Sequence, residues 1–165
     1  MNFLLAEQSW WDQRQFDPID GYEELSPRDA KIAHIQLHVA KASLKLLTNN
    51  PDTIKKEVVP DLAIYRSQIM NAVDIKPDQI DEPYLLDRLP LNFVIRANGN
   101  LASYVEQLQH GETMPLHPVI RGAEYLHYAS VILAHHYDLD LEAAQRTRME
   151  NFIGGPLPEA IGEHV

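Results

Sequence analysis

The chain has 165 residues with 24 acidic side chains and 14 lysines and arginines, which gives a formal net charge of -10. This length favours one domain whose hydrophobic core is large enough to be stable without disulfides or bound metal ions. The absence of cysteine excludes disulfides, thiol catalysis and cysteine-based zinc sites. The negative charge argues against a nucleic-acid partner, because such binding needs a basic face. No apolar stretch approaches the roughly 20 residues that span a bilayer. We therefore expect a cytoplasmic protein that does not enter the membrane.

The first part of the chain predicts two helices. The apolar residues of segment 1–16 favour a short N-terminal helix, and residues 17–25 read as a loop. Ser26 followed by Pro27 is a typical helix start, with an N-cap hydroxyl and a proline in the first turn. The second helix then continues to about Thr48. Its apolar residues follow the 3-4-3-4 spacing of a helical face, namely Ile32, Ile35, Val39, Ala42 and Leu46.

The remaining helices are separated by short turns rich in proline, aspartate and glycine. Pro60 lies inside a predicted helix and either kinks it or marks its true start. Gly111 is suited to end a helix, and the chain from Gly154 onward reads as a loose tail. We expect an all-α antiparallel bundle over 26–152, between an N-terminal segment 1–25 and a tail 153–165. Its later helices are predicted at 53–73, shortly after 78, and at 91–109, 119–137 and 141–152.

The bundle region shows a weak internal repeat, with units at 26–88 and 91–152. Segments 61–80 and 125–144 each contain a long apolar helix, an aspartate-containing turn and the start of a further helix. The turns are Val73-Asp74-Ile75 and Tyr137-Asp138-Leu139, and segment 41–46 resembles segment 96–101 upstream. Two interpretations are open. The chain consists of two tandem helical units, or the similarity is only what any antiparallel bundle produces.

The second unit carries the more specific motifs. Residues 138–144 (DLDLEAA), followed by Arg146 and Arg148, resemble the distal part of the MazG-like, all-α nucleoside triphosphate pyrophosphohydrolases. Residues 98–102 (NGNLA) are similar to that family's Gly-Glu-Leu-Ala stretch, and the first unit is similar through residues 60–65 and Asp74-Ile75. The resemblance implies that two fused units form a pseudo-dimer with an internal cleft, as a monomer or a homodimer.

The resemblance also shows where the chain departs from the family. Those enzymes hold Mg²⁺ with a Glu-Glu-x-x-Glu motif and a Glu-x-x-Asp motif on successive helices, because Mg²⁺ prefers hard oxygen ligands. Of the ten corresponding positions, only Asp61 is acidic. The first unit has Lys41, Ala42, Lys45, Val58 and Asp61, and the second has Arg96, Ala97, Asn100, Gly122 and Tyr125.

These substitutions favour a catalytically degenerate relative that needs no cofactor. It would bind a nucleotide or other phosphorylated ligand at a basic pocket of Lys41, Lys45, Arg96 and Asn100, or act as a protein-interaction module. An active metal-dependent pyrophosphohydrolase with a rearranged Mg²⁺ site is one alternative. A purely structural assembly protein, whose helical faces bind a protein partner, is another.

His34 and His38 lie one helical turn apart, which is a spacing that can bind a metal. Glu57 and Asp61 could complete a four-ligand site with them. The same spacing extends to Lys41 and Lys45, so two other interpretations are open. The stripe is a solvated face, or its cations form cross-helix ion pairs with Glu57 and Asp61. These six residues are His34, His38, Lys41, Lys45, Glu57 and Asp61.

Three further patterns are weak. Glu124-x-x-His127 matches one of the two Glu-x-x-His motifs that di-iron bundles need, and we expect His127 to be a partly exposed helix residue. His135 and His136 near a helix C-terminus favour a structural role. Trp10-Trp11 either docks on the bundle or forms a partner surface.

Overall fold

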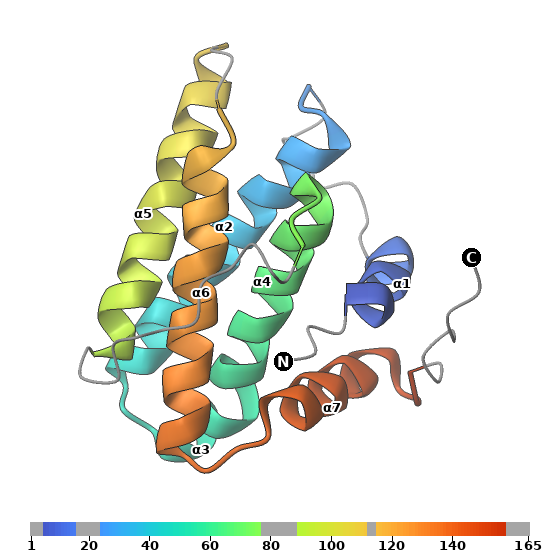
Figure 1. The fold of residues 1–165 in the computed structure, drawn as a ribbon, viewed down its shortest axis with the longest axis vertical. Helices are drawn as coiled ribbons and strands as arrows, with labels where there is room; N and C mark the ends of the chain where they lie inside the picture. Colours follow the sequence, from blue (N-terminus) through green and yellow to red (C-terminus); the bar gives the residue numbers. More distant parts are fainter. Residues whose placement is uncertain (1–4, 16–23, 77–88, 112–114, 158–165) are drawn as a thin grey trace.

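The computed structural model describes residues 5–15, 24–76, 89–111 and 115–157, and every regular element in these ranges is helical (Figure 1). The all-α prediction is confirmed, while the short helix expected after residue 78 lies outside the described residues. The elements are α1 (Leu5–Gln15), α2 (Pro27–Leu47), α3 (Pro51–Thr53), the π-helical turn η1 (Ile54–Val58), α4 (Val59–Val73), α5 (Pro90–Gln109), α6 (His117–His136) and α7 (Leu141–Ile153).

Four long helices form an antiparallel bundle in which neighbours follow the order α2, α4, α6, α5 and back to α2. Two hydrogen bonds set the register of α2 against α5: Tyr104 donates to Asp29 (2.8 Å) and Gln36 donates to Asn98 (3.0 Å). Helices α1 and α7 lie outside the bundle against α4 (Figure 1). Among the helices that the structure describes, none has the length and hydropathy to cross a bilayer.

The predicted helix starts are confirmed by their caps. The Ser26 hydroxyl accepts a hydrogen bond from the Asp29 amide (3.2 Å), and Pro27 occupies the first turn of α2. Asp140 caps α7 in the same way, accepting from the Ala143 amide (3.0 Å). Each such cap satisfies an amide that has no partner within the helix and contributes about 1 kcal/mol.

Pro60 both marks a helix start and disturbs the chain before it. Helix α4 begins at Val59, with the proline in its first turn. A proline has no amide hydrogen, and its ring crowds the carbonyl four residues earlier. The preceding turn is accordingly wider, because the Val59 amide donates to the carbonyl of Ile54, five residues back. This π-helical turn joins α3 to α4 without a break.

The core lies where the four helices meet. On α2, the predicted apolar stripe is buried except for Leu46, which is partly covered. All four helices contribute side chains with no exposed surface, for example Ile35, Leu62, Leu101 and Leu126. Burying each of these contributes roughly 1.5–3 kcal/mol, so the bundle is held mainly by this shared interior.

The two hairpins end in the same kind of turn. Asp74 after α4 and Asp138 after α6 both adopt left-handed backbone conformations, with φ of 54° and 53°. After Asp74, the next amide donates to the carbonyl of Met70 (2.9 Å); after Asp138, the corresponding bond reaches Ala134 (2.8 Å). Both turns therefore close the helix end by the same 6→1 bond.

The expected loose tail is wrong for its first residues. Leu157 is only 5% exposed and packs with Ile64 and Met149. Its amide also donates to the Glu150 carboxylate (3.2 Å). Gly154 ends α7 with a positive φ of 68°, which turns the chain back so that Leu157 reaches the bundle.

Two glycines on neighbouring helices should respond oppositely to substitution. A Cβ at Gly122 of α6 would lie 3.0 Å from the Leu101 side chain, whereas a Cβ at Gly99 of α5 would meet open space. We expect Gly122→Val to lower the free energy of unfolding by about 1–3 kcal/mol through overpacking. Gly99→Ala should raise it by about 0.5–1 kcal/mol. Urea denaturation of both variants checks this. Equal changes in the free energy of unfolding would contradict the close approach of α5 and α6 at Gly122.

Candidate functional site

A surface hollow of about 340 Å³ lies between α5 and α6. Two neighbouring helices supply its walls, four residues from one and two from the other. These two sets come together because α5 and α6 are adjacent antiparallel helices of the bundle. The lining residues are Arg96, Gly99, Asn100 and Ser103 of α5, and Pro118 and Tyr125 of α6.

The hollow combines a cation with an aromatic face and contains no carboxylate among its lining residues. The exposed Arg96 guanidinium lies 5.9 Å from the centroid of the Tyr125 ring. Asn100 is oriented by donating from its side-chain amide to the Arg96 carbonyl (2.9 Å). Tyr125 is held by ring contacts with Phe93 and Tyr128, at centroid distances of 6.0 and 6.4 Å. Such a set suits an anion with a flat apolar group.

The start of α6 adds positive potential on the same side. Pro118 lies in the first turn of this helix, which contains no acidic residue. Leu116 at the N-cap position has no side-chain oxygen to accept from the first amides. A helix N-terminus carries roughly half a positive charge, so the field here reinforces that of Arg96.

The structure separates the four predicted ligand contacts. Arg96 and Asn100 line the hollow, but Lys41 and Lys45 lie on α2 and do not. Lys45 instead donates to Glu57 of η1 (2.7 Å), and this ion pair lowers the pKa of Glu57. The separation arises because the hollow lies between α5 and α6, and no residue of α2 lines it. A single basic pocket of all four residues is therefore wrong.

The four predicted metal ligands also bind different partners. Arg148 of α7 donates two hydrogen bonds to Asp61 (2.8 and 3.2 Å), and Glu57 pairs with Lys45. His34 and His38 do lie together, with ring centroids 4.4 Å apart. In the described parts of the chain, no group of three or more histidines and carboxylates could hold a metal. The cross-helix ion pair predicted for Lys45 and Glu57 is confirmed, whereas the partner of Asp61 is Arg148.

The histidine pair lies in a partly buried row beside α4. The Tyr65 hydroxyl is at hydrogen-bond distance from His38 Nδ1 (3.3 Å). Burial, with the nearby charges of His38 and Lys41, lowers the pKa of His34 to about 4. Burial and the charge of Lys41 also lower the pKa of His38. The imidazoles are thus neutral at physiological pH, which fits a structural role between α2 and α4.

Sequence reasoning missed a buried polar cluster centred on Arg66 of α4. This side chain is 1% exposed and donates from Nη2 to Ser67 Oγ and Gln145 Oε1, both at 3.3 Å. Its Nη1 lies 3.3 Å from His127 Nδ1. Burial lowers the pKa of Arg66 to about 9. The cluster links α4 to α6 and α7 through hydrogen bonds in the interior.

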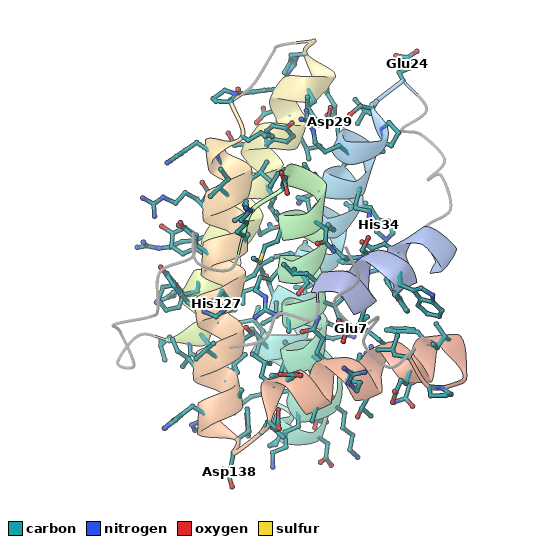
Figure 2. All side chains as sticks on the ribbon, turned by 45° about the vertical axis from the view of Figure 1, so that its right-hand side comes forward. Glu7, Glu24, Asp29, His34, His127 and Asp138 are labelled. Atoms are coloured by element: carbon teal, nitrogen blue, oxygen red, sulfur yellow. The ribbon has the colours of Figure 1, made fainter. Side chains whose placement is uncertain are left out.

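His127 is buried, and the expectation of a partly exposed residue is wrong. It is 3% exposed and projects from α6 (Figure 2). Its neighbour in the cluster is the Arg66 guanidinium. Burial, together with this positive charge, lowers the pKa of His127 to about 4. The side chain is therefore neutral near pH 7 and accepts a hydrogen bond from arginine.

The cluster extends to α1 through amide and carboxylate groups. Gln145 donates to Gln8 (3.5 Å), and both Gln8 and Gln68 donate to one Asp12 oxygen (2.9 and 2.8 Å). Lys31 of α2 donates to the other Asp12 oxygen (2.8 Å). Asp12 is 4% exposed, so α1 is held by a buried polar core as well as by apolar packing.

The docking of Trp10 and Trp11 on the bundle, one of the two predicted outcomes, is confirmed. Both rings pack against an apolar cluster that contains Ile64, Met149 and Leu157. Trp11 also contacts the Phe152 ring, with centroids 6.1 Å apart. The aromatic pair thus anchors α1 to α4 and α7.

Comparison with protein-family models, with curated proteins and with solved structures gives no match for this chain.

Proposed function

We propose that the protein binds a small phosphorylated ligand, such as a nucleotide, in the α5–α6 hollow and is a catalytically degenerate relative of the MazG-like pyrophosphohydrolases. The observation that carries this proposal is the convergence of Arg96, Asn100 and Tyr125 on one hollow of about 340 Å³. This volume is in the range of small-molecule sites, roughly 300–1,000 Å³.

The lining suggests how each part of such a ligand is held. Arg96 would bind phosphate oxygens through its planar fork of donors, with support from the N-terminal turn of α6. The Tyr125 ring offers a face on which a base can stack. Ser103 and Asn100 supply polar atoms at the rim. The sequence pattern supports this arrangement, because Arg96, Asn100 and Tyr125 occupy three of the positions where the family has metal-binding acids.

The first unit supports a binding role without catalysis. Its counterparts of the hollow residues are Lys41 and Lys45 on α2 and Asp61 on α4. Here Arg148 of α7 pairs with Asp61 at 2.8 Å. A metal-dependent reaction would require Asp61 to leave Arg148 and to be joined by further oxygen ligands. The enzyme alternative therefore needs a rearrangement that the binding role does not.

Isothermal titration calorimetry with a panel of nucleoside triphosphates tests the proposal, with and without Mg²⁺, Mn²⁺ or Zn²⁺. We expect binding heat without pyrophosphate release. Arg96→Ala should weaken binding about tenfold or more, since a charge-assisted contact contributes about 1.5–3 kcal/mol. Gly99→Val, which projects a side chain into the hollow, should also weaken binding. Lys41→Ala is the matched control and should leave the heat unchanged.

Two results would contradict the proposal in different ways. Metal-dependent pyrophosphate release that is lost in Asp61→Ala would show an active enzyme with a rearranged site. Absence of both binding heat and pyrophosphate release for every nucleotide would show that the hollow is not a nucleotide site. It would favour the protein-interaction alternative.

A further inference from the structure

A second surface is apolar rather than hollow. In the part of the chain that the structure describes, six large apolar side chains are exposed, and five of them lie on α2 and at the start of α5. They are between 45% and 69% exposed. We name this surface the α2–α5 ridge, and its members are Leu37, Leu44, Leu47, Leu89 and Ile95.

The α2 part of the ridge has the spacing of a helix-packing seam. Leu37, Ala40, Leu44 and Leu47 follow a 3-4-3 pattern, which is how one helix packs along another. The opposite side of α2 carries the buried stripe that includes Ile35. A helix that is apolar on both sides is normally covered on both sides. The outer stripe of α2 therefore has the character of an interface.

The two parts of the ridge lie at the same end of the bundle. Helices α2 and α5 are antiparallel neighbours, and the Gln36–Asn98 hydrogen bond fixes their register near the middle of each. Leu47 follows Gln36 along α2, and Leu89 precedes Asn98, so both lie toward the end where α2 finishes and α5 begins. Exposed apolar side chains gathered on neighbouring helices are typical of interaction sites.

The charge around the ridge is unlike that of the whole chain. The protein has a net charge of -10, yet residues 30–51 and 89–105 contain no aspartate or glutamate. Lys41 is exposed on α2, one helical turn from both Leu37 and Leu44. The ridge is thus an apolar strip with a basic border on an acidic protein. Charge complementarity therefore requires a partner with acidic borders.

We propose that the α2–α5 ridge binds an amphipathic α-helix of a partner protein whose apolar stripe is bordered by acidic residues. The 3-4-3 stripe supplies the apolar contact, and Lys41 selects the charge of the borders. A second copy of this chain fits less well, because a two-fold contact through α2 would place basic borders against basic borders. The proposal rests on the ridge and not on ligand binding in the hollow.

Fluorescence anisotropy with two synthetic helical peptides tests this proposal. Both peptides carry leucines in 3-4-3 spacing, one with glutamate borders and one with lysine borders. We expect the glutamate peptide to bind at least about tenfold more tightly, and its affinity to fall as salt screens the borders. Leu44→Ser should weaken binding about tenfold through lost apolar contact. Lys41→Glu should weaken binding of the glutamate peptide and strengthen binding of the lysine peptide.

Matched controls separate this site from other effects. Phe152 is the sixth exposed large apolar residue but lies on α7, so Phe152→Ser should leave peptide binding unchanged. Leu44 is 66% exposed, so Leu44→Ser should leave the thermal unfolding midpoint unchanged. It should also leave unchanged any heat of nucleotide binding in the hollow. Equal binding of both peptides, or no effect of Leu44→Ser, would overturn the proposal. A solution mass of twice 18.8 kDa that Leu44→Ser returns to the monomer value would also overturn it, in favour of a second copy.

Discussion

Replacing Gln145 by leucine is expected to lower the free energy of unfolding by about 3 kcal/mol. Gln145 is 1% exposed, accepts from Arg66 and donates to Ser67 (3.2 Å). Leucine has similar volume but would remove an acceptor from a buried guanidinium. Depriving a buried charge of a partner costs about 3–5 kcal/mol in related cases, and losing a neutral buried hydrogen bond costs less. Urea denaturation followed by circular dichroism measures the change.

A double-mutant cycle shows whether the loss comes from the arginine. Arg66→Met removes the buried charge while keeping much of the side-chain length, so the desolvation of a guanidinium disappears with it. We expect Arg66→Met/Gln145→Leu to be destabilised by less than the two single changes together. The exposed Gln109→Leu serves as control and should change stability by less than about 0.5 kcal/mol. Additive losses in the cycle would show that the two side chains act independently.

Acidification is expected to destabilise the protein through His127. The pKa of this group is about 4 in the folded protein, against 6.5 in an unfolded chain. The unfolded state therefore binds the proton more readily, and stability falls as the pH drops from about 6.5 to about 4. With 1.36 kcal/mol per unit, the full loss is on the order of 3 kcal/mol, of which roughly 2 kcal/mol is reached by pH 5. Urea denaturation across this pH range measures it.

Substitution separates His127 from the other histidines. His127→Gln cannot gain a proton, so its stability should depend less on pH in this window, even if it is lower at pH 7. His34 also has a pKa lowered to about 4, but it is only half-buried, and solvent screening reduces its contribution. The exposed His135→Gln is the control and should leave the pH dependence unchanged. An unchanged slope in His127→Gln would mean that another group causes the acid sensitivity.

The main helices could be predicted because their signals are local. A Ser-Pro start on α2, a 3-4-3-4 apolar stripe and the glycine after α5, Gly111, each act within one or two turns, and each is confirmed. Pro60 predicts either a kink or a helix start, and the structure combines both. The pairing of Lys45 with Glu57 could also be predicted, because the two residues face one another across a short turn.

The rest depended on helix rotation and on long-range contacts. Lys41 and Arg96 correspond in the predicted repeat, but only the packed bundle shows that Arg96 faces Tyr125 of α6 whereas Lys41 is exposed on α2. Arg148 reaches Asp61 across 87 positions of sequence, and no local pattern indicates that pairing. A buried arginine such as Arg66 is also unexpected from composition, because arginine is normally at the surface. A usable signal was present in the polar run Arg66-Ser67-Gln68 within an otherwise apolar helix.

The contact between the first and last helices has a consequence for synthesis of the chain. Arg146 of α7 donates to Glu7 of α1 (3.0 Å) across 139 positions, and Gln145 likewise reaches Gln8. A ribosome releases α1 first and α4 before α7, so Gln68 of α4 can bind Asp12 early, but the α7 side chains that complete the contact emerge last. Contacts this distant in sequence form late, because a long loop must close before they contribute. Helix α1 should therefore dock on α4 first, and Trp11 should lack the covering Phe152 ring of α7 until translation ends, which leaves this aromatic site open to chaperones in the meantime.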